Sequence, residues 1–321
     1  MQRTLRHLAP RALSRQSQIL VPSFNYARGF NTSGACNDKS SNENQYKNFP
    51  WKLSTDPLRI PDYPYKSAPD TWSFLNILPR GIQHSMSQFL CNRMLELNTG
   101  SSYFPEQFLV GASMASRRAL DVLSNHLSHP NDPVPAELQS MLSPELLYRL
   151  TEAAKETLQE GDVVSLSVPQ VYDVNVGDIW VTLGNSNATT NPRKYELIEW
   201  MTLQLGLKRS VVDDVDENFK DYRARVSKGL MEGAHVAVDV LIDADVEFSI
   251  TRGEKVLVKD QGRRELIMRF ETPYFEPAHD MVSGRDEMGE PINEWRWRIA
   301  DVDHWLEKEK LDRENEDEDE D

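Results

Sequence analysis

Apolar residues recur every three or four positions over residues 82–97, and this spacing predicts an amphipathic helix. A second helix is predicted from Pro105, because proline at the first helical position loses no hydrogen bond. Its stripe of apolar and small side chains comprises Phe108, Ala112, Ala115, Ala119 and Val122. A third helix is predicted over residues 143–158, where Ser143 can cap the first turn and Glu145 suits the positive end of the helix dipole.

β-branched and aromatic residues dominate the chain after residue 160, and no further helix is predicted there. Strands are predicted at 163–168, 171–176, 178–183 and 195–205. The clearest strand is 236–250, where apolar residues occupy alternate positions. The other face of this strand carries His235, Asp239, Asp243, Asp245 and Glu247. Arginines on the later strands, among them Arg269, Arg296 and Arg298, are predicted to pair with this acidic row unless water solvates it.

Helices followed by a long antiparallel sheet predict an α+β fold, with N-terminal helices packed on one face of a curved sheet. The predicted domain spans residues 71–306. It is preceded by a disordered tether over 31–70, which is rich in Asn, Ser, Lys and Pro and has no apolar period. Residues 307–321 are predicted to form a disordered acidic tail, since their negative charges repel one another.

The first 37 residues contain five arginines and no acidic residue, which is typical of a mitochondrial transit peptide. Arg28 stands two residues before Phe30, so we expect residues 1–30 to be removed and the mature chain to begin near Asn31. A disordered basic arm is the alternative interpretation. The full chain carries a formal charge of −15, and without these five arginines 31 basic residues face 51 acidic ones, a net charge of −20. Such a chain is not a general polyanion binder, and we expect no DNA partner.

No run of apolar residues reaches the roughly 18 positions that a membrane-spanning helix needs. Membrane contact is therefore predicted to come from a limited surface of the first helical region, where apolar residues alternate with cations. The candidate membrane or partner contacts are Trp72, Phe74, Arg80, Ile82, Phe89 and Arg93. The alternative is that this stripe packs on the sheet.

Candidate chemistry is sparse. His235, Asp239, Asp303 and His304 are the residue types of a general acid/base set, yet the sequence has no nucleophile motif and no phosphate-binding glycine loop. Cys36 and Cys91 form neither a disulfide framework nor a zinc-ligand pattern. We therefore predict no catalytic residue, cofactor or metal. The alternating Trp295 and Trp297 are interpreted either as core residues or as the lining of a groove for a client peptide.

Several short segments, taken in order, resemble the family of the mitochondrial m-AAA protease-interacting protein. They are Phe108-Leu109-Val110-Gly111-Ala112, Gly177-Asp178-Ile179, Gly233-Ala234-His235-Val236, and the run from Trp295 to His304. That family shares a superfamily with the C-terminal domain of the import-motor scaffold subunit and with a mitochondrial large-ribosomal-subunit protein. The resemblance implies a cone-like fold of the cystatin/NTF-like kind. A polar insertion at 276–293 departs from the family pattern.

The resemblance also implies a location in the mitochondrial matrix, peripheral on the inner membrane. The expected function is that of a non-enzymatic adaptor or chaperone-like factor. Its expected partners are the m-AAA protease, newly imported or synthesised inner-membrane proteins, and inner-membrane lipid. The alternative function is a component of the mitochondrial ribosome's large subunit, or a factor that docks the ribosome to the membrane.

Overall fold

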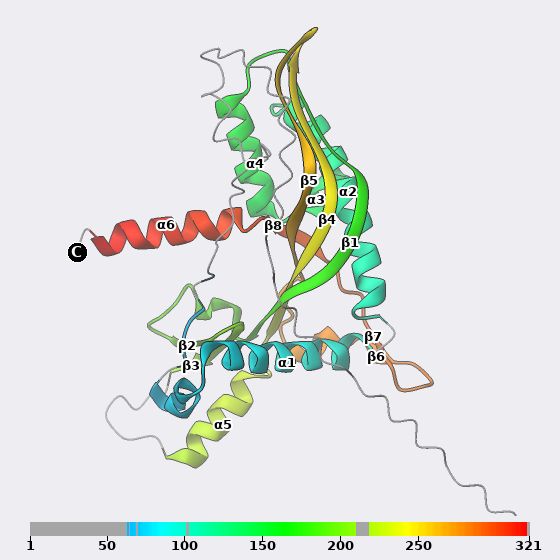
Figure 1. The fold of residues 1–321 in the computed structure, drawn as a ribbon. Helices are drawn as coiled ribbons and strands as arrows, with labels where there is room; N and C mark the ends of the chain where they lie inside the picture. Colours follow the sequence, from blue (N-terminus) through cyan, green and yellow to red (C-terminus); the bar gives the residue numbers. More distant parts are fainter. Residues whose placement is uncertain (1–62, 64, 69, 101–102, 210–217, 320–321) are drawn as a thin grey trace, which may run out of the picture. The chain divides into compact units, whose positions relative to one another are not determined.

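The computed structural model describes residues 63, 65–68, 70–100, 103–209 and 218–319. The predicted transit peptide at 1–30, its cleavage site, and most of the predicted tether at 31–70 lie outside the described residues. Residues 63 and 65–68, which were assigned to the tether, lie against the sheet instead. The described part of the chain is α+β, as predicted, with helices preceding a curved sheet (Figure 1).

Three N-terminal helices form where the sequence predicts them: α1 (Arg80–Thr99), α2 (Glu106–Ser128) and α4 (Pro144–Thr157). A 3₁₀ helix, η1 (Asp70–Ile77), precedes α1, and a short helix that was not predicted, α3 (Ala136–Met141), lies between α2 and α4. The predicted cap of α4 is present, since the Ser143 hydroxyl accepts a hydrogen bond from the backbone N–H of Leu146 at 3.2 Å.

The sheet has six strands in the order β2-β3-β1-β4-β5-β8, and all neighbours are antiparallel except β1 and β3. The strands are β1 (Asp162–Gly184), β2 (Tyr195–Trp200), β3 (Leu203–Lys208), β4 (Ala234–Arg252), β5 (Lys255–Glu271) and β8 (Arg298–Val302). Between β5 and β8 lie the 3₁₀ helix η3 (Ala278–Met281) and a small hairpin of β6 (Gly284–Arg285) and β7 (Pro291–Ile292). A further 3₁₀ turn, η2 (Ser186–Ala188), follows β1.

Three boundary predictions were wrong. The three strands predicted between 163 and 183 are one strand, β1, because its register against β4 shifts at three points where the chain bends without ending. The strand predicted at 195–205 is the hairpin β2–β3. Its turn includes Met201 with a φ of 50°, and the sequence has no glycine at this position to indicate a turn. Helix α5 (Phe219–Gly229) lies between β3 and β4, where no helix was predicted; Asn218 caps it.

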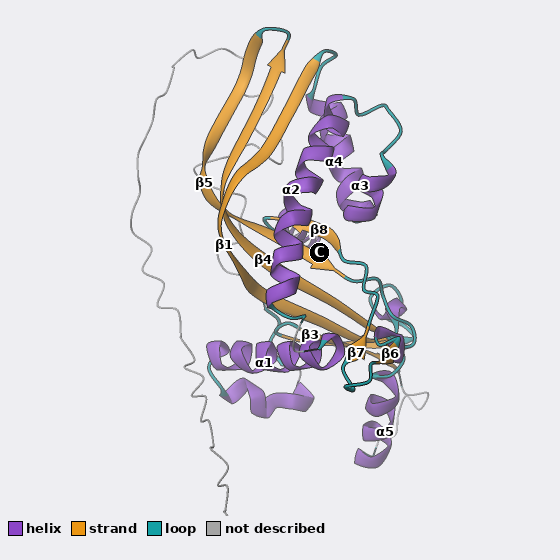
Figure 2. Cartoon of the chain, turned by 90° about the vertical axis from the view of Figure 1, so that its right-hand side faces the viewer, coloured by secondary structure: helices purple, strands orange, loops and turns teal. Residues whose placement is uncertain are grey.

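The core forms between α2 and one face of the sheet. On β4 the alternating residues Val236, Val238, Val240 and Ile242 are all buried, which confirms the predicted period. Ala112 and other small or apolar residues of α2 pack into the same cluster. Figure 2 shows α2 running along the long, curving strand β1. Trp297 lies with its ring centroid 4.8 Å from that of Phe108, so the core interpretation of this tryptophan is confirmed.

Side chains of two helices form hydrogen bonds with backbone groups along the edge of β1 that faces away from β4. The Ser124 hydroxyl of α2 bonds both the N–H and the carbonyl of Leu166, and Ser128 does the same at Val164. From α1, the Gln88 amide bonds both backbone groups of Ile179, at 2.9 and 3.3 Å. These side chains take the place of a neighbouring strand, which blunts an edge that would otherwise be open to pairing.

The C-terminal segment differs from its prediction. Helix α6 (Trp305–Asp319) covers most of the stretch expected to be a disordered tail over 307–321. The Asp301 carboxylate accepts hydrogen bonds from the backbone N–H groups of Leu306 and Glu307 at 3.0 and 3.1 Å, which caps the first turn. Arg149 of α4 bonds Glu309 through both guanidinium branches. These tertiary contacts stabilise the first turns of α6, and the acidic residues that follow continue the same helix.

Candidate functional site

The apolar stripe of α1 faces solvent. Ile82, Met86, Phe89, Leu90 and Leu97 keep between 40 and 69% of their surface exposed. Their three- and four-residue spacing places them on one side of the helix. The alternative interpretation, in which this stripe packs on the sheet, is therefore wrong.

The buried side of α1 is mostly polar or small and has one large apolar residue, Leu95. Its residues are Gln83, Ser87, Cys91, Leu95 and Thr99. The side-chain amide oxygen of Gln83 accepts a hydrogen bond from the indole N–H of Trp200 at 3.0 Å, and the Ser87 and Thr202 hydroxyl oxygens lie 3.0 Å apart. Together with the bonds of Gln88 to the backbone of β1, these side-chain bonds attach α1 to the edge of the sheet. This attachment turns the apolar stripe outward.

The predicted contact residues on η1 and at the ends of the α1 stripe are exposed as well. On η1, Phe74 is 65% exposed and its neighbour Ile77 is 84% exposed. Arg80 is exposed at the start of α1, and the exposed Arg93 contacts Glu96 at 3.5 Å. The side chain of Trp72 lies outside the described residues. We call the exposed apolar and basic residues of η1 and α1 together the docking face; its described members are Phe74, Ile77, Arg80, Ile82, Met86, Phe89, Leu90, Arg93 and Leu97.

The insertion at 276–293 adds two apolar residues near the end of α1, and sequence reasoning missed them. Met288 on the β6–β7 hairpin is 88% exposed, and Ile292 is 48% exposed. The hairpin is tied to α1 because the side-chain amide of Asn293 donates to the carbonyl of Asn98 at 3.0 Å. The available signal was the position of Met288 among charged residues and glycine, in the run Arg285-Asp286-Glu287-Met288-Gly289-Glu290.

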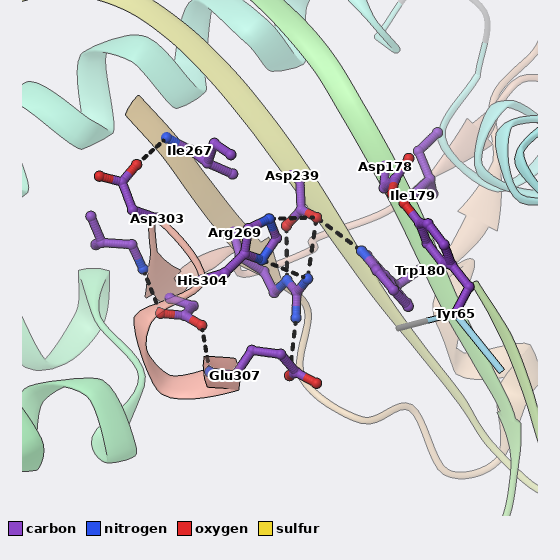
Figure 3. Close-up of polar contacts among 12 residues, drawn as sticks. Tyr65, Asp178, Ile179, Trp180, Asp239, Ile267, Arg269, Asp303, His304 and Glu307 are labelled. Carbon is purple, nitrogen blue, oxygen red and sulfur yellow. Dashed lines mark hydrogen bonds and ion pairs between the residues drawn. The ribbon is translucent and has the colours of Figure 1, made fainter. Parts of the chain in front are cut away.

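A buried polar cluster lies on the sheet face opposite the core (Figure 3). Arg269 of β5 forms a two-pronged ion pair with Asp239 of β4, at 2.8 and 3.2 Å, which confirms the predicted cross-strand partner. These side chains are only 10 and 4% exposed. The indole N–H of Trp180 also donates to Asp239, at 2.9 Å. Burial by itself lowers the pKa of Arg269, but the charge and hydrogen bonds of Asp239, together with Tyr63 and Glu307, outweigh it and hold that pKa well above its ordinary value.

The four residues considered as an acid/base set do not converge on one site. His304 joins the cluster, with its Nδ1 atom 3.3 Å from Arg269. The carboxylate of Asp303 instead accepts from the backbone N–H of Ile267 at 2.8 Å and contacts Arg264. His235 stacks on Tyr274, with ring centroids 5.8 Å apart.

Burial shifts the pKa of two neighbouring groups on β4 and β5. It lowers the pKa of His235 to about 4 and raises that of Glu271 to about 7. The two side chains approach to 3.7 Å. These shifts favour the neutral form of both groups in mildly acidic solution. The contact between them is then not an ion pair.

Over the described residues no group of three or more His, Cys, Asp or Glu side chains could hold a metal ion, and no helix is long and apolar enough to cross a membrane. Cys91 is a buried free thiol, and burial raises its pKa to about 11. A thiol in this state is not a reactive nucleophile.

No protein-family profile matches the chain, and no curated protein matches it in sequence. Among solved structures, the chain is similar to the intermembrane-space region of the chloroplast protein ARC6. The two are 11% identical, the similarity covers 59% of this chain and 92% of that one, and the TM-score is 0.23. At this TM-score the similarity carries no argument about function.

Proposed function

We propose that the protein is a non-enzymatic adaptor that lies on the matrix side of the mitochondrial inner membrane through its docking face. There it binds newly imported or synthesised inner-membrane proteins and cooperates with the m-AAA protease in their maturation or insertion. The observation that supports this proposal is the exposed apolar stripe on η1 and α1. The client and protease partners come from the sequence resemblance.

The docking face has the composition of an interfacial helix. A soluble surface seldom gathers this many large apolar side chains, and such a patch marks a binding site for protein or membrane. Complete burial of one such side chain contributes roughly 1.5–3 kcal/mol, so a half-exposed one has about 1 kcal/mol left to gain. Five on α1 then contribute about 5 kcal/mol, which is enough for reversible attachment.

The charges on α1 favour its binding to an anionic membrane surface. Arg80 and Arg93 flank or interrupt the apolar stripe, and each contributes about 1 kcal/mol near anionic lipid. Glu96 is the one acidic residue of α1, and it is bonded to Asn92 and Arg93. The chain as a whole has an excess of acidic residues, so α1, with two arginines and one acidic residue, is a place where an anionic surface can approach.

Flotation with vesicles of phosphatidylcholine and cardiolipin tests the proposal. The wild-type chain is expected to float with the vesicles, and the double variant Ile82→Glu/Phe89→Glu is expected to stay in the pellet fraction. The matched control is Tyr148→Glu/Met231→Glu, which changes two residues that are 63 and 57% exposed outside the docking face. Flotation of the α1 variant at the wild-type level would refute the role of the docking face.

One observation favours the alternative of ribosome docking. Helix α5 exposes Lys220, Arg223 and Lys228, and the end of β3 adds the exposed Lys208 and Arg209. A local basic surface of this kind is what phosphate-rich RNA requires. Co-sedimentation with the large ribosomal subunit at physiological salt, lost on charge reversal of the three α5 residues, would support this alternative. No co-sedimentation under these conditions would leave the membrane adaptor as the better description.

A further inference from the structure

A short segment before η1 lies across the sheet face opposite the core. We call residues 63 and 65–68 the strap. The Tyr63 ring lies with its centroid 4.8 Å from that of Trp180 and 5.7 Å from that of His304. The Tyr65 ring centroid is 4.8 Å from that of His84, and its hydroxyl donates to Asp178. Two tyrosines that are separated by one residue therefore reach two neighbouring groups of side chains.

The surface under the strap is charged as well as aromatic. The Arg269 guanidinium carbon lies 5.0 Å from the centroid of the Trp180 ring, and Arg269 is paired with Asp239 (Figure 3). Asp178 accepts from both Tyr65 and His84, the latter at 3.0 Å. Charged groups regain water when they are uncovered, whereas uncovering the apolar face of the sheet has no such compensation. This face is therefore built to tolerate opening.

The strap is attached far more weakly than a strand. Within the described residues, its one backbone hydrogen bond to the sheet runs from the Met201 N–H to the Lys66 carbonyl at 2.9 Å. Lys66 and Ser67 are exposed, both tyrosines are half-buried, and Ala68 is buried. Segments with few backbone bonds and few buried contacts open at a lower free energy than the sheet beneath them.

We propose that this face is an acceptor site for an extended peptide segment carrying Tyr-X-Tyr, and that the strap is its resident ligand in exchange with an open state. Recognition uses the rings of Trp180, His84 and His304 for the tyrosine rings, and Asp178 for a phenol hydroxyl. The Met201 N–H holds the backbone of the segment. A free segment of the same pattern competes with the strap for the site.

The first test uses a fluorescent synthetic peptide with the sequence of residues 58–68 and the full-length chain. In the variant Tyr63→Ala/Tyr65→Ala the strap no longer occupies the acceptor site of its own chain. The peptide is therefore expected to bind this variant at least about tenfold more tightly than it binds the wild type. Adding Trp180→Ala is expected to abolish that gain. Equal affinity for the wild type and the double variant up to millimolar peptide would overturn the proposal, as would a gain that survives the loss of Trp180.

The second test needs no variant and decides the matter if the double variant does not fold. Amide hydrogen exchange of the wild-type chain compares two N–H groups around the β2–β3 hairpin. The Met201 N–H bonds the strap, and the Val181 N–H bonds the carbonyl of Thr202 within the sheet. The proposal expects Met201 to exchange at least about tenfold faster, because the strap opens while the sheet stays closed. Equal protection of both amides would show that the strap is a fixed part of the fold and would overturn the proposal.

Discussion

Replacing Asp239 with alanine tests the buried polar cluster most directly. Asp239 supplies both carboxylate oxygens to Arg269, which has a side chain only 10% exposed, and it also accepts from the Trp180 indole. The substitution leaves a guanidinium and an indole N–H without their main acceptor in a site that water reaches poorly. Uncompensated burial of a charge, and not the loss of attraction itself, is the expected source of the damage.

The structure sets the expected magnitude. Breaking a buried ion pair by removing one partner costs about 3–5 kcal/mol. Glu307 remains 3.6 Å from Arg269 and can take over part of the charge, so we place the loss for Asp239→Ala near the lower end, at about 3 kcal/mol. For a domain of this size, that corresponds to a decrease in Tm of roughly 6–12 °C.

A matched control lies on the same two strands. Asp243 and Arg263 form an ion pair with the same two-pronged geometry, but Arg263 is 58% exposed. Asp243→Ala is expected to cause a much smaller loss, since exposed ion pairs contribute little to stability. Urea unfolding followed by circular dichroism measures both variants. Equal decreases in the midpoint would refute the argument that burial makes the Asp239 pair important.

Three further predictions follow from local environments. Ala112 is 4% exposed in the core while a Cβ at Gly111 would contact nothing, so Ala112→Leu should destabilise the protein by roughly 1–3 kcal/mol and Gly111→Ala should not; equal thermal melts would show that α2 packs differently. Because the Glu271 pKa is raised from 4.5 to about 7, the stability it contributes is complete below about pH 4.5 and is lost as the pH rises through 7. Glu271→Gln should remove this pH dependence, a change in unfolding free energy of less than about 3 kcal/mol because the side chain is 34% exposed. The lowered pKa of His235 makes stability change with pH in the opposite direction, and it is present in both the wild type and the variant. If the difference in stability between the two proteins stays constant across pH 4.5–7, the raised pKa of Glu271 is refuted. Sequencing the N-terminus of the protein from mitochondria should find a start near Asn31, and an intact Met1 in matrix material would contradict the presequence interpretation.

Local patterns predicted much of the fold. Each correctly predicted helix has its own three- and four-residue period, and Ser143 caps α4 through a contact three residues away, so neighbours in sequence were sufficient. The same holds for β4, where strict alternation separates the core face from the acidic row. The pairing of Asp239 with Arg269 was predictable because opposite charges stood at suitable positions of two strands that had to meet.

The features that local patterns missed depend on distant contacts. Strand β1 stays continuous through its bulges because β4 pairs with it along its length, and nothing in its own residues shows this. Helix α6 begins because Asp301 and Arg149 bind its first turns. The polar cluster is closed by the strap, which the composition of residues 31–70 had suggested was an unattached tether.

The candidate docking site shows the same division. The sequence by itself determined that residues 82–97 form an amphipathic helix, since the period of apolar residues is a local property. Which side of that helix meets the protein was decided only by tertiary structure. Gln88 bonds the backbone of β1, and Gln83 and Ser87 bond the side chains of Trp200 and Thr202 near the β2–β3 turn. A buried polar group without a partner costs more than an exposed apolar side chain. The apolar stripe of α1 is left facing outward for that reason.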